Sequence, residues 1–403
     1  MKKRNVVILV IFSLVIFFSV KKIVTLRDEQ HSVSFMGWNL KIKGPYIKRS
    51  ISTTGTRNSD TEFFANDFNV SFHRIAGIEI NKSAGAYFTE NGDIRIIEQA
   101  DKILLQNLFP AKDINQLFKE IENLNGGIKQ YFRLSNQEFA LLGLKESGCT
   151  FGSFFNITKK IEILRMPCLP DSANADLNGL GGGFSFDGVS LLLAIGAPET
   201  FSGAIRALAQ DRSSPYGKVI RFKKTDLERA QNGKFEIFSM GHRNPQGMSS
   251  IGGTLYLVEH GPKGGDEINL VKQGSNFGWP ILSLGTGYDD KLLYKSAENP
   301  KNAPKFADPV FSFVPSIGIS DITKCPGIVA KRYAPLRCLL VSSLRGNSLF
   351  IVLIEQKRQA VASIEKIEFD ERIREFVKSS KDETYILTDA GGAYRVKFDM
   401  VVK

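Results

Sequence analysis

The chain has 403 residues, of which 42% are hydrophobic and 24% charged, which excludes the disordered and collagen-like classes. A chain of this length can bury a hydrophobic core that is large enough to be stable without disulfide bonds. The formal net charge of +11 favours a solvated surface that faces anionic lipid headgroups or envelope polymers. Nucleic-acid binding is not expected, because no run of Lys and Arg exceeds three residues and no zinc finger, RNP-like motif or basic helix is present.

The N-terminus has the pattern of a membrane anchor. Three basic residues at 2–4 precede an apolar run at 6–20, and two lysines follow it. The run has the length of a signal-peptide core, but no small-x-small cleavage site follows. We expect an uncleaved signal anchor, a transmembrane segment at 1–24, with an N-in orientation and an exported remainder. A cleaved signal or an unusually apolar first helix is the alternative.

Residues 25–60 show no sustained period and are interpreted as a tether and lead-in. From Asp113 to Leu124, apolar residues recur at helical spacing, and the NGG segment that follows would end this helix. From about residue 137 onward, short runs such as EFALLGL, KIEIL and GTLYLVE alternate with Gly, Asn and Asp, which predicts strands.

These strands favour a β-propeller at 61–403. No long helix interrupts them, so a parallel βαβ sheet is not expected. A unit of strand, DG or GG turn, strand and Gly recurs, as in FSFDGVSLLLAIG and SSIGGTLYLVEHG. Such recurrence is typical of the inner strands of successive propeller blades.

Four cysteines are present, and none forms a CxxC pair, which argues against zinc and thioredoxin chemistry. In an exported domain they could form one or two disulfides, and three pairings are possible. They could equally be small buried hydrophobic residues. The four are Cys149, Cys168, Cys325 and Cys338.

The segment at 240–280 holds the candidate binding residues, in a loop-rich stretch where glycine and proline let backbone approach a ligand. Arg243 beside Asn244 could grip a carboxylate or a quinone oxygen, or could tie loops together. Asp266 and Glu267 could ligate calcium or be solvated turn residues. The motifs GHRNPQG and EHGPKGGDE flank the strand TLYLV. They lie either at opposite ends of that strand or folded back onto one site.

In combination, GHRNPQG, EHGPKGGDEIN and NFGWP resemble the signature of the soluble aldose sugar dehydrogenases, the glucose/sorbosone dehydrogenase family. Later segments match in order over roughly residues 175–400, among them VPSIGIS, LLVSSLRGNSL, ERIREF and YILTDAGGAYRV. The resemblance implies an all-β, six-bladed β-propeller, here on an N-terminal transmembrane anchor. It also implies pyrroloquinoline quinone (PQQ) and calcium as cofactors, and a sugar as substrate.

The resemblance also implies site residues. PQQ bears three carboxylates and an ortho-quinone, so it requires cationic clamps. The family takes these from the Arg-Asn of GHRN, a basic residue in an SLK/R-G turn and the two arginines of an RxR motif, with a polar residue beside the cofactor. The matching residues are Arg243, Asn244, Arg345, Arg372, Arg374 and, beside the cofactor, His260. The calcium positions match Gly261, Pro262, Asp266 and Glu267.

The family's catalytic histidine has no counterpart at the expected position. That histidine accepts the proton of the anomeric hydroxyl while hydride moves to the quinone. Here the stretch reads ADLNGLGGGFSFDG, and counting back from the DG turn places Leu177 at the histidine position, after Asp176. A glycine near Gly181 replaces an expected arginine. Either the register differs and Asp176 or another residue is the base, or another histidine such as His73 supplies it, or the reaction is lost.

We therefore expect a PQQ-dependent, sugar-dehydrogenase-like oxidoreductase that is impaired at its catalytic step. The alternative is a non-catalytic propeller that binds a carbohydrate, an anionic ligand or a protein in the cell envelope. A purely structural envelope protein has only the bulk composition in its favour. The expected partners are a small sugar and, through the anchor, a membrane, but no nucleic acid.

Overall fold

The computed structural model describes the strand backbones at 32–35, 38–41, 47–48 and 61–64, together with residues 67–78, 83–89, 91, 93–170, 172, 174–198, 202–229, 234–287, 305–377 and 382–401. The predicted anchor at 1–24 lies outside these residues. Within them, no helix is long and apolar enough to cross a membrane.

The chain divides into two compact units, residues 1–48 and 49–403. In the first unit, β1 (Ser32–Phe35) pairs antiparallel with β2 (Trp38–Lys41), and β3 (Ile47–Lys48) follows. All the other described elements belong to the second unit, which carries the site.

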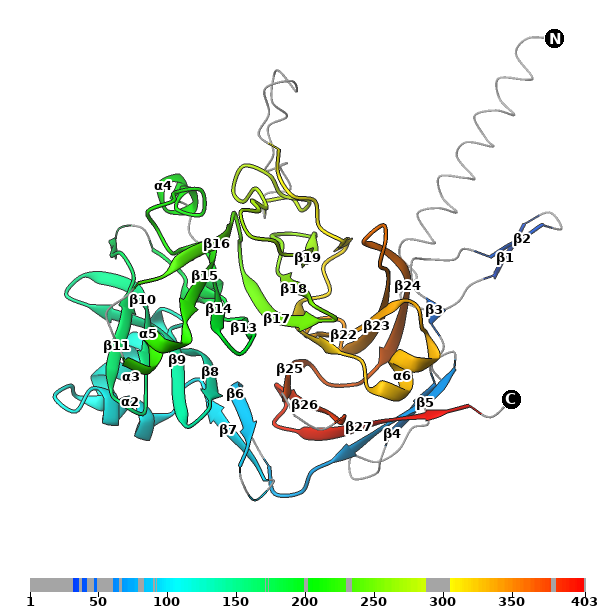
Figure 1. The fold of residues 1–403 in the computed structure, drawn as a ribbon, viewed down its shortest axis with the longest axis horizontal. Helices are drawn as coiled ribbons and strands as arrows, with labels where there is room; N and C mark the ends of the chain where they lie inside the picture. Colours follow the sequence, from blue (N-terminus) through cyan, green and yellow to red (C-terminus); the bar gives the residue numbers. More distant parts are fainter. Residues whose placement is uncertain are drawn as a thin grey trace, which may run out of the picture. The chain divides into compact units, whose positions relative to one another are not determined.

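The described part of the second unit forms six antiparallel sheets, which follow one another around a common centre (Figure 1). The first three sheets are made of consecutive strands. Sheet 1 consists of β6 (Ser83–Phe88) and β7 (Ile94–Glu98). Sheet 2 consists of β8 (Gly127–Leu134), β9 (Gln137–Glu146), β10 (Cys149–Asn156) and β11 (Ile161–Arg165), with β12 (Leu169–Pro170) also paired to β10. Sheet 3 consists of β13 (Phe184–Phe186), β14 (Ser190–Ile195), β15 (Lys218–Lys223) and β16 (Glu236–Met240).

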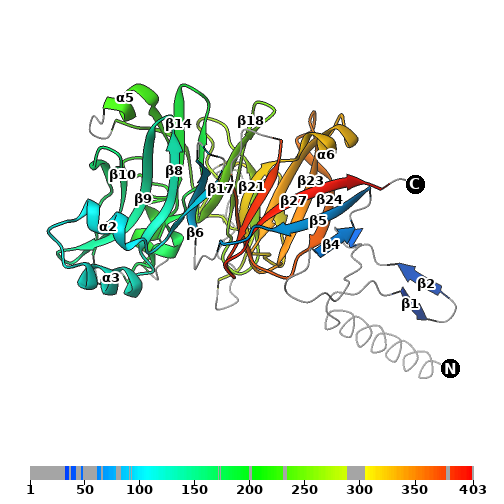
Figure 2. The ribbon, with the colours of Figure 1, turned by 90° about the horizontal axis from the view of Figure 1, so that it is seen from below.

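The last sheet joins the two ends of the unit, because C-terminal β27 pairs with N-terminal β5. Figure 2 shows these two strands lying side by side. Sheet 4 consists of β17 (Pro245–Ile251), β18 (Thr254–Glu259), β19 (Asp266–Leu270) and β20 (Phe311–Phe313). Sheet 5 contains β21 (Ile319–Lys324), β22 (Arg337–Ser343), β23 (Ser348–Glu355) and β24 (Ala360–Glu368). Sheet 6 consists of β25 (Ile373–Val377), β26 (Thr384–Thr388), β27 (Ala393–Met400), β5 (Phe68–Arg74) and β4 (Thr61–Phe64).

The described helices are short and lie between strands. They are α2 (Lys102–Leu108), α3 (Ile114–Asn123), the 3₁₀ helix η2 (Leu177–Leu180), α4 (Gly203–Ala207), α5 (Lys224–Arg229) and α6 (Gly327–Arg332). The helix predicted from Asp113 to Leu124 is confirmed as α3. Asp113 caps its first turn by accepting the backbone N–H of Asn115 at 2.8 Å, and Leu117 and Ile121 bury one face.

The core lies between neighbouring sheets, whose faces pack on each other. Phe132 and Phe154 of sheet 2 pack in one cluster with Leu193 and Phe222 of sheet 3. Separate clusters join sheets 1 and 2, sheets 3 and 4, sheets 5 and 6, and sheets 6 and 1. Burial of apolar surface on both faces of most sheets is what holds such a ring together. The all-β, propeller-like fold predicted from the strand pattern is confirmed.

Two disulfides join cysteines close in sequence. Cys149 at the start of β10 bonds to Cys168 beside β12, and Cys325 bonds to Cys338 on β22. The sequence left three pairings open. No free cysteine remains.

The strand order brings distant loops to one edge of the ring. In an antiparallel sheet, the start of the first strand and the turn between the second and third strands lie at the same edge. We call this the start edge. In sheet 4 it carries the residues before β17 and the loop from β18 to β19. In sheet 6 it carries the residues before β25 and the turn from β26 to β27.

Candidate functional site

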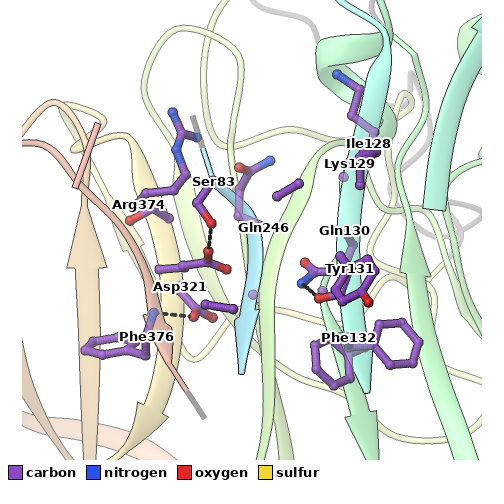
Figure 3. Close-up of a pocket in the computed structure, with 18 of the residues that line it drawn as sticks. Ser83, Ile128, Lys129, Gln130, Tyr131, Phe132, Gln246, Asp321, Arg374 and Phe376 are labelled. Atoms are coloured by element: carbon purple, nitrogen blue, oxygen red, sulfur yellow. Dashed lines mark hydrogen bonds between the residues drawn. The ribbon is translucent and has the colours of Figure 1, made fainter. Parts of the chain in front are cut away.

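An axial cavity of about 270 Å³ lies where the first strands of the six sheets meet. Its walls come from β6, β8, β13, β17, β21 and β25 (Figure 3). The strands approach closely: a Cβ on Gly247 of β17 would lie 2.2 Å from Asp321 Oδ1 of β21. Only glycine fits there. Aromatic residues line part of the wall, with Phe132 stacked on Phe184 at 4.2 Å between ring centres.

Most first strands carry a β-bulge near their start. The register shifts between Ile128 and Gln130 in β8, and between Ile373 and Glu375 in β25. Equivalent shifts occur in β6, β17 and β21. Successive side chains of a regular strand point to opposite faces, and a bulge interrupts that alternation. Consecutive residues, such as Arg374 and Glu375, therefore both line the cavity.

The two motifs of sheet 4 meet at the start edge. The sequence PQGMSSI forms a strand, β17, so two strands and not one separate GHRN from EHGP. The hairpin returns the chain, and the backbone N–H of His260 donates to the carbonyl of Asn244 at 3.0 Å. Of the two arrangements that the sequence allowed, the motifs adopt the one that forms a single site.

Arg243 is 6% exposed and is held by the loop that follows β18. Its Nη1 donates to the carbonyls of His260 at 3.1 Å and of Gly261 at 2.8 Å. Its guanidinium lies 5.3 Å from the ring centre of Trp279. The loop-tying role considered from the sequence is therefore present. Beside it, Asn244 accepts a hydrogen bond from Gln246, whose side chain lines the cavity.

Arg372 and Arg374 share one carboxylate, that of Asp389 in the turn from β26 to β27. Arg374 donates to both Asp389 oxygens, at 2.8 and 2.9 Å, and Arg372 donates at 2.9 Å. Burial raises the pKa of Asp389, but hydrogen bonds and charges from both arginines outweigh this and hold the pKa below its usual value. Arg374 also lines the cavity, whereas Arg372 is exposed.

Arg345 stands in the turn from β22 to β23, at the same edge. Its backbone N–H donates to the carbonyl of Ile317 at 2.9 Å. Its side chain is exposed and makes no hydrogen bond or ion pair with the residues that the structure describes. It is therefore available to an anionic ligand.

His260 lies between the arginines of sheets 4 and 6. Burial lowers the pKa of His260, Asp266 opposes this, and Arg243 and Arg374 lower the pKa further. The imidazole is therefore favoured in its neutral form. Its Nδ1 lies 3.5 Å from Asn244 Nδ2.

The buried carboxylate of Glu259 fixes the GHRN segment by hydrogen bonds. Glu259 is 3% exposed. It accepts the backbone N–H of Arg243 at 2.7 Å, the His242 ring at 3.0 Å and the Asn269 amide at 2.7 Å. Beside it, burial and the charge of Glu259 raise the pKa of Glu267 to about 8.

The predicted calcium ligands are largely committed to other partners. Asp266 is 1% exposed and accepts the backbone N–H groups of Gly261, Gly318 and Ile319. The carbonyl of Gly261 accepts Arg243 Nη1. The described residues contain no group of three His, Cys, Asp or Glu side chains that could hold a metal ion. Calcium binding at Gly261, Pro262, Asp266 and Glu267 therefore remains a prediction.

The start edge also carries donors that suit an anionic ligand. Trp279 is 5% exposed, and its indole Nε1 has no hydrogen-bond partner among the described residues. Together with Arg243, it lines a small cavity of about 20 Å³ whose wall also includes Glu259 and Glu267. An unsatisfied donor next to a guanidinium is suited to an acceptor that carries negative charge.

Comparison with known proteins assigns the chain to a family. The family model for glucose/sorbosone dehydrogenases matches residues 172–396, which is more than half of the chain.

The chain belongs to the glucose/sorbosone dehydrogenase family.

Individual relatives are more distant. The chain is 27% identical over 204 residues to the uncharacterized protein slr1608 of Synechocystis, which is 48% of each chain. It is 37% identical over 121 residues to the aldose sugar dehydrogenase YliI of Escherichia coli, 28% of this chain and 31% of that protein. The chain thus spans at most about half the length of these curated relatives. A PQQ-bound aldose sugar dehydrogenase structure from Streptomyces coelicolor shares the fold with a TM-score of 0.55 at 18% identity, covering 83% of this chain and 99% of that one.

At the position assigned to the family histidine, Leu177 is completely buried. It begins η2 and packs on Gly143 of β9, where a Cβ would lie 2.8 Å from Leu177 Cδ1. Asp176 caps η2 by accepting the backbone N–H of Asn178 at 2.8 Å. Asn178 is the residue of this turn that lines the cavity. No residue from 177 to 183 has an ionisable side chain, and Asp176 is not among the residues that line the cavity, so neither a later register nor Asp176 supplies a base at the cavity wall.

His73 does not replace the histidine either. It lies on β5, the fourth strand of sheet 6, and its ring contacts Ser71 at 3.0 Å. It is absent from the cavity wall. Two described histidines lie near Arg243: His242, whose ring contacts Ser239 and Glu259, and His260, which also senses the charge of Arg374.

Sequence reasoning missed several polar residues of the cavity, namely Lys129, Gln130, Ser320, Asp321 and Glu375. A bulge is not visible in the sequence, so these residues could not be assigned to one face. Asp389 lies in the matched segment YILTDAGGAYRV. Its position two residues before the paired glycines of a turn was the available signal.

Proposed function

We propose that this chain binds PQQ at the start edge and oxidises sugar CH–OH groups with a slow catalytic step. The observation that carries the proposal is that the six matched residues all lie in start-edge segments of sheets 4, 5 and 6, where Arg374 lines the axial cavity. They come from three sheets, and the two that are farthest apart in sequence, Arg243 and Arg374, are separated by 131 residues. Membership of the glucose/sorbosone dehydrogenase family supports the same chemistry.

Each residue has a role in this proposal. Arg374, Arg372 and Arg345 bind the carboxylates of PQQ, and bidentate guanidinium pairs suit that task. Arg243 and Asn244 would hold its quinone oxygens, and neutral His260 would contact it. When bound, PQQ supplies the ortho-quinone that accepts hydride from the sugar carbon. Asp389 keeps Arg372 and Arg374 side by side until a ligand carboxylate competes for them.

The slow step follows from the missing base. The sugar hydroxyl must lose its proton as the carbon loses hydride, and Leu177 cannot accept it. A general base contributes about two to four orders of magnitude in rate. We therefore expect turnover that is lower than in a histidine-containing enzyme by a comparable factor.

A second candidate function is ligand binding without turnover. The complete burial of Leu177 favours it, because this turn then presents only Asn178 to the cavity. Tight PQQ or sugar binding with no dye reduction would identify this case.

The surrounding architecture is part of the proposal. Each of the six sheets is taken as one blade of a six-bladed propeller. The N-terminal segment at 1–24 is taken as a membrane anchor, with the propeller exported to the periplasm or cell exterior. The two disulfides support an oxidising compartment. Calcium binding at Gly261, Pro262, Asp266 and Glu267 stays a prediction, and no step above uses it.

The variant Arg374→Ala tests whether the arginines bind the carboxylates of PQQ. We expect PQQ affinity, measured by titration of cofactor absorbance, to fall at least tenfold, because a charge-assisted bidentate contact is lost. Arg395→Ala is the matched control, since Arg395 pairs with Glu383 on the outer part of sheet 6. Equal affinity in wild type and Arg374→Ala would remove Arg374 from the site.

A further inference from the structure

The axial cavity has two tiers of different charge. The upper tier consists of the bulge residues Lys129, Gln246, Ser320 and Arg374, and it is cationic. The lower tier consists of the next polar residue on each of three strands, Gln130 on β8, Asp321 on β21 and Glu375 on β25, and Arg133 of β8 lines the same wall. Figure 3 shows Arg374 and Gln246 above Asp321, with Gln130 on the opposite wall. The lower tier is rich in hydrogen-bond acceptors.

We propose that this lower tier binds the hydroxyl groups of one neutral monosaccharide, with Glu375 as the principal acceptor. The proposal takes its substrate class from the proposed function. It assigns residues that the sequence did not indicate, and it does not require PQQ to be bound.

The two carboxylates of this tier differ in what they can offer. Asp321 is 7% exposed, and its oxygens accept the backbone N–H groups of Ile322 at 2.8 Å and Phe376 at 2.9 Å. It ties β21 to β25. Glu375 is more exposed, and its Oε1 accepts the hydroxyl of Ser83 from β6. A carboxylate has several acceptor sites and can accept more than one hydroxyl. Glu375 can therefore accept a hydrogen bond from a sugar hydroxyl in addition to the one from Ser83.

The size and the walls of the cavity also suit a sugar. Its volume of about 270 Å³ is many times what one water molecule requires and leaves room for one monosaccharide ring. Amide groups of Gln130 and Gln246 can both donate and accept, as sugar hydroxyls do. The faces of Phe132 and Phe184 provide an apolar wall for the ring carbons.

The test is a calorimetric titration of the protein, without PQQ, with D-glucose, D-galactose, D-mannose and D-xylose. We expect at least one sugar to bind, and Glu375→Gln to weaken that binding about tenfold while keeping the shape of the side chain and the contact with Ser83. Gln130→Ala should weaken it by a smaller factor. Asp321 is left unchanged because it joins two strands.

Glu371→Gln is the matched control. Glu371 precedes β25 and also accepts hydroxyls, from Thr388 at 2.5 Å and Tyr394 at 2.6 Å, but it does not line the cavity. Its sugar affinity should equal that of wild type. Two results would overturn the inference: no sugar bound at 100-fold molar excess over millimolar protein, or equal affinity in Glu375→Gln and wild type. Sugar binding that depends on Glu375 in a chain that ignores PQQ would instead overturn the proposed function alone.

Discussion

At the residue scale, one turn decides which side chain faces the axial cavity. Leu177 and Asn178 are neighbours, but Leu177 points into the core beneath Gly143 and Asn178 lines the cavity. Counting residues back from the DG turn places the family histidine at Leu177. The structure places the side chain that faces the cavity one position later. A 3₁₀ turn in a glycine-rich stretch determines which residue faces inward, and sequence spacing does not reveal this.

Asn178→His should therefore raise the rate of sugar oxidation, and Leu177→His should not. An imidazole at position 178 would reach the cavity, and a general base is worth about 100-fold or more. At position 177 it would be buried without a partner and cost about 2–4 kcal/mol of stability. Dye reduction with PQQ and a sugar panel, beside urea unfolding of both variants, measures the two effects. Equal rates in Asn178→His and wild type would show that this turn does not face the substrate.

At the element scale, the spacing of hydrophobic residues predicted the regular helices and strands but missed the strands that carry bulges. Helix α3 and strands β9 to β11 follow from apolar spacing and turn residues. Strands β6 and β8 were not identified, because they lie before the segment that resembles the family and carry bulges. The segment SSIGGTLYLVEHG was recognised as a strand, turn and strand, but the two motifs were described as flanking the single strand TLYLV. That reading left the relation of Asn244 to His260 open, although the hairpin brings them together.

A buried lysine stabilises one long connection at the element scale. Lys218, on β15, is fully buried, and its Nζ donates to the carbonyls of Leu208, Ala209 and Tyr216 at 2.8 to 3.0 Å. These carbonyls belong to the segment between β14 and β15, next to α4. Burial lowers the pKa of Lys218 to about 8, below its ordinary value of 10.5.

Lys218→Met should lower stability at pH 7 by about 1–3 kcal/mol, because buried carbonyls lose their donor. The pH dependence has a definite sign. Between about pH 8 and 10.5, the folded state has released the proton and the unfolded state retains it, so the wild type gains stability as pH rises. The variant lacks this gain. Urea unfolding at pH 7, 9 and 10 measures both effects, with exposed Lys223→Met as the control. Parallel pH profiles for wild type and Lys218→Met would contradict the assignment.

At the scale of the whole molecule, the fold class was predictable because sheet-on-sheet packing demands many short apolar strands. Family motifs supplied the positions of Arg243, Arg345, Arg372 and Arg374, which lie in separate loops. Their convergence depends on the antiparallel order of each sheet, which no single motif contains. The polar wall of the cavity was not predictable, because bulges change the facing of side chains without changing the hydrophobic pattern.

The disulfides should contribute to the stability of the whole ring. They close loops with sequence separations of 19 and 13 residues, and loops of this length correspond to about 3 kcal/mol each in the chain-entropy model. Replacing Cys149 and Cys168 together by alanine should lower the unfolding free energy by about that amount. Thermal unfolding of this variant, with and without reductant, measures the effect. An unchanged midpoint in both conditions would show that this bridge does not form in solution.

The most direct test of the central claim is a PQQ titration of the chain from residue 28 onward, followed by dye reduction with a panel of aldoses. We predict saturable PQQ binding that weakens in Arg374→Ala, and sugar oxidation that is slow in the wild type and faster in Asn178→His. Absence of PQQ binding would contradict the account. The converging arginines would then be a structural cluster at the end of a propeller that serves another ligand.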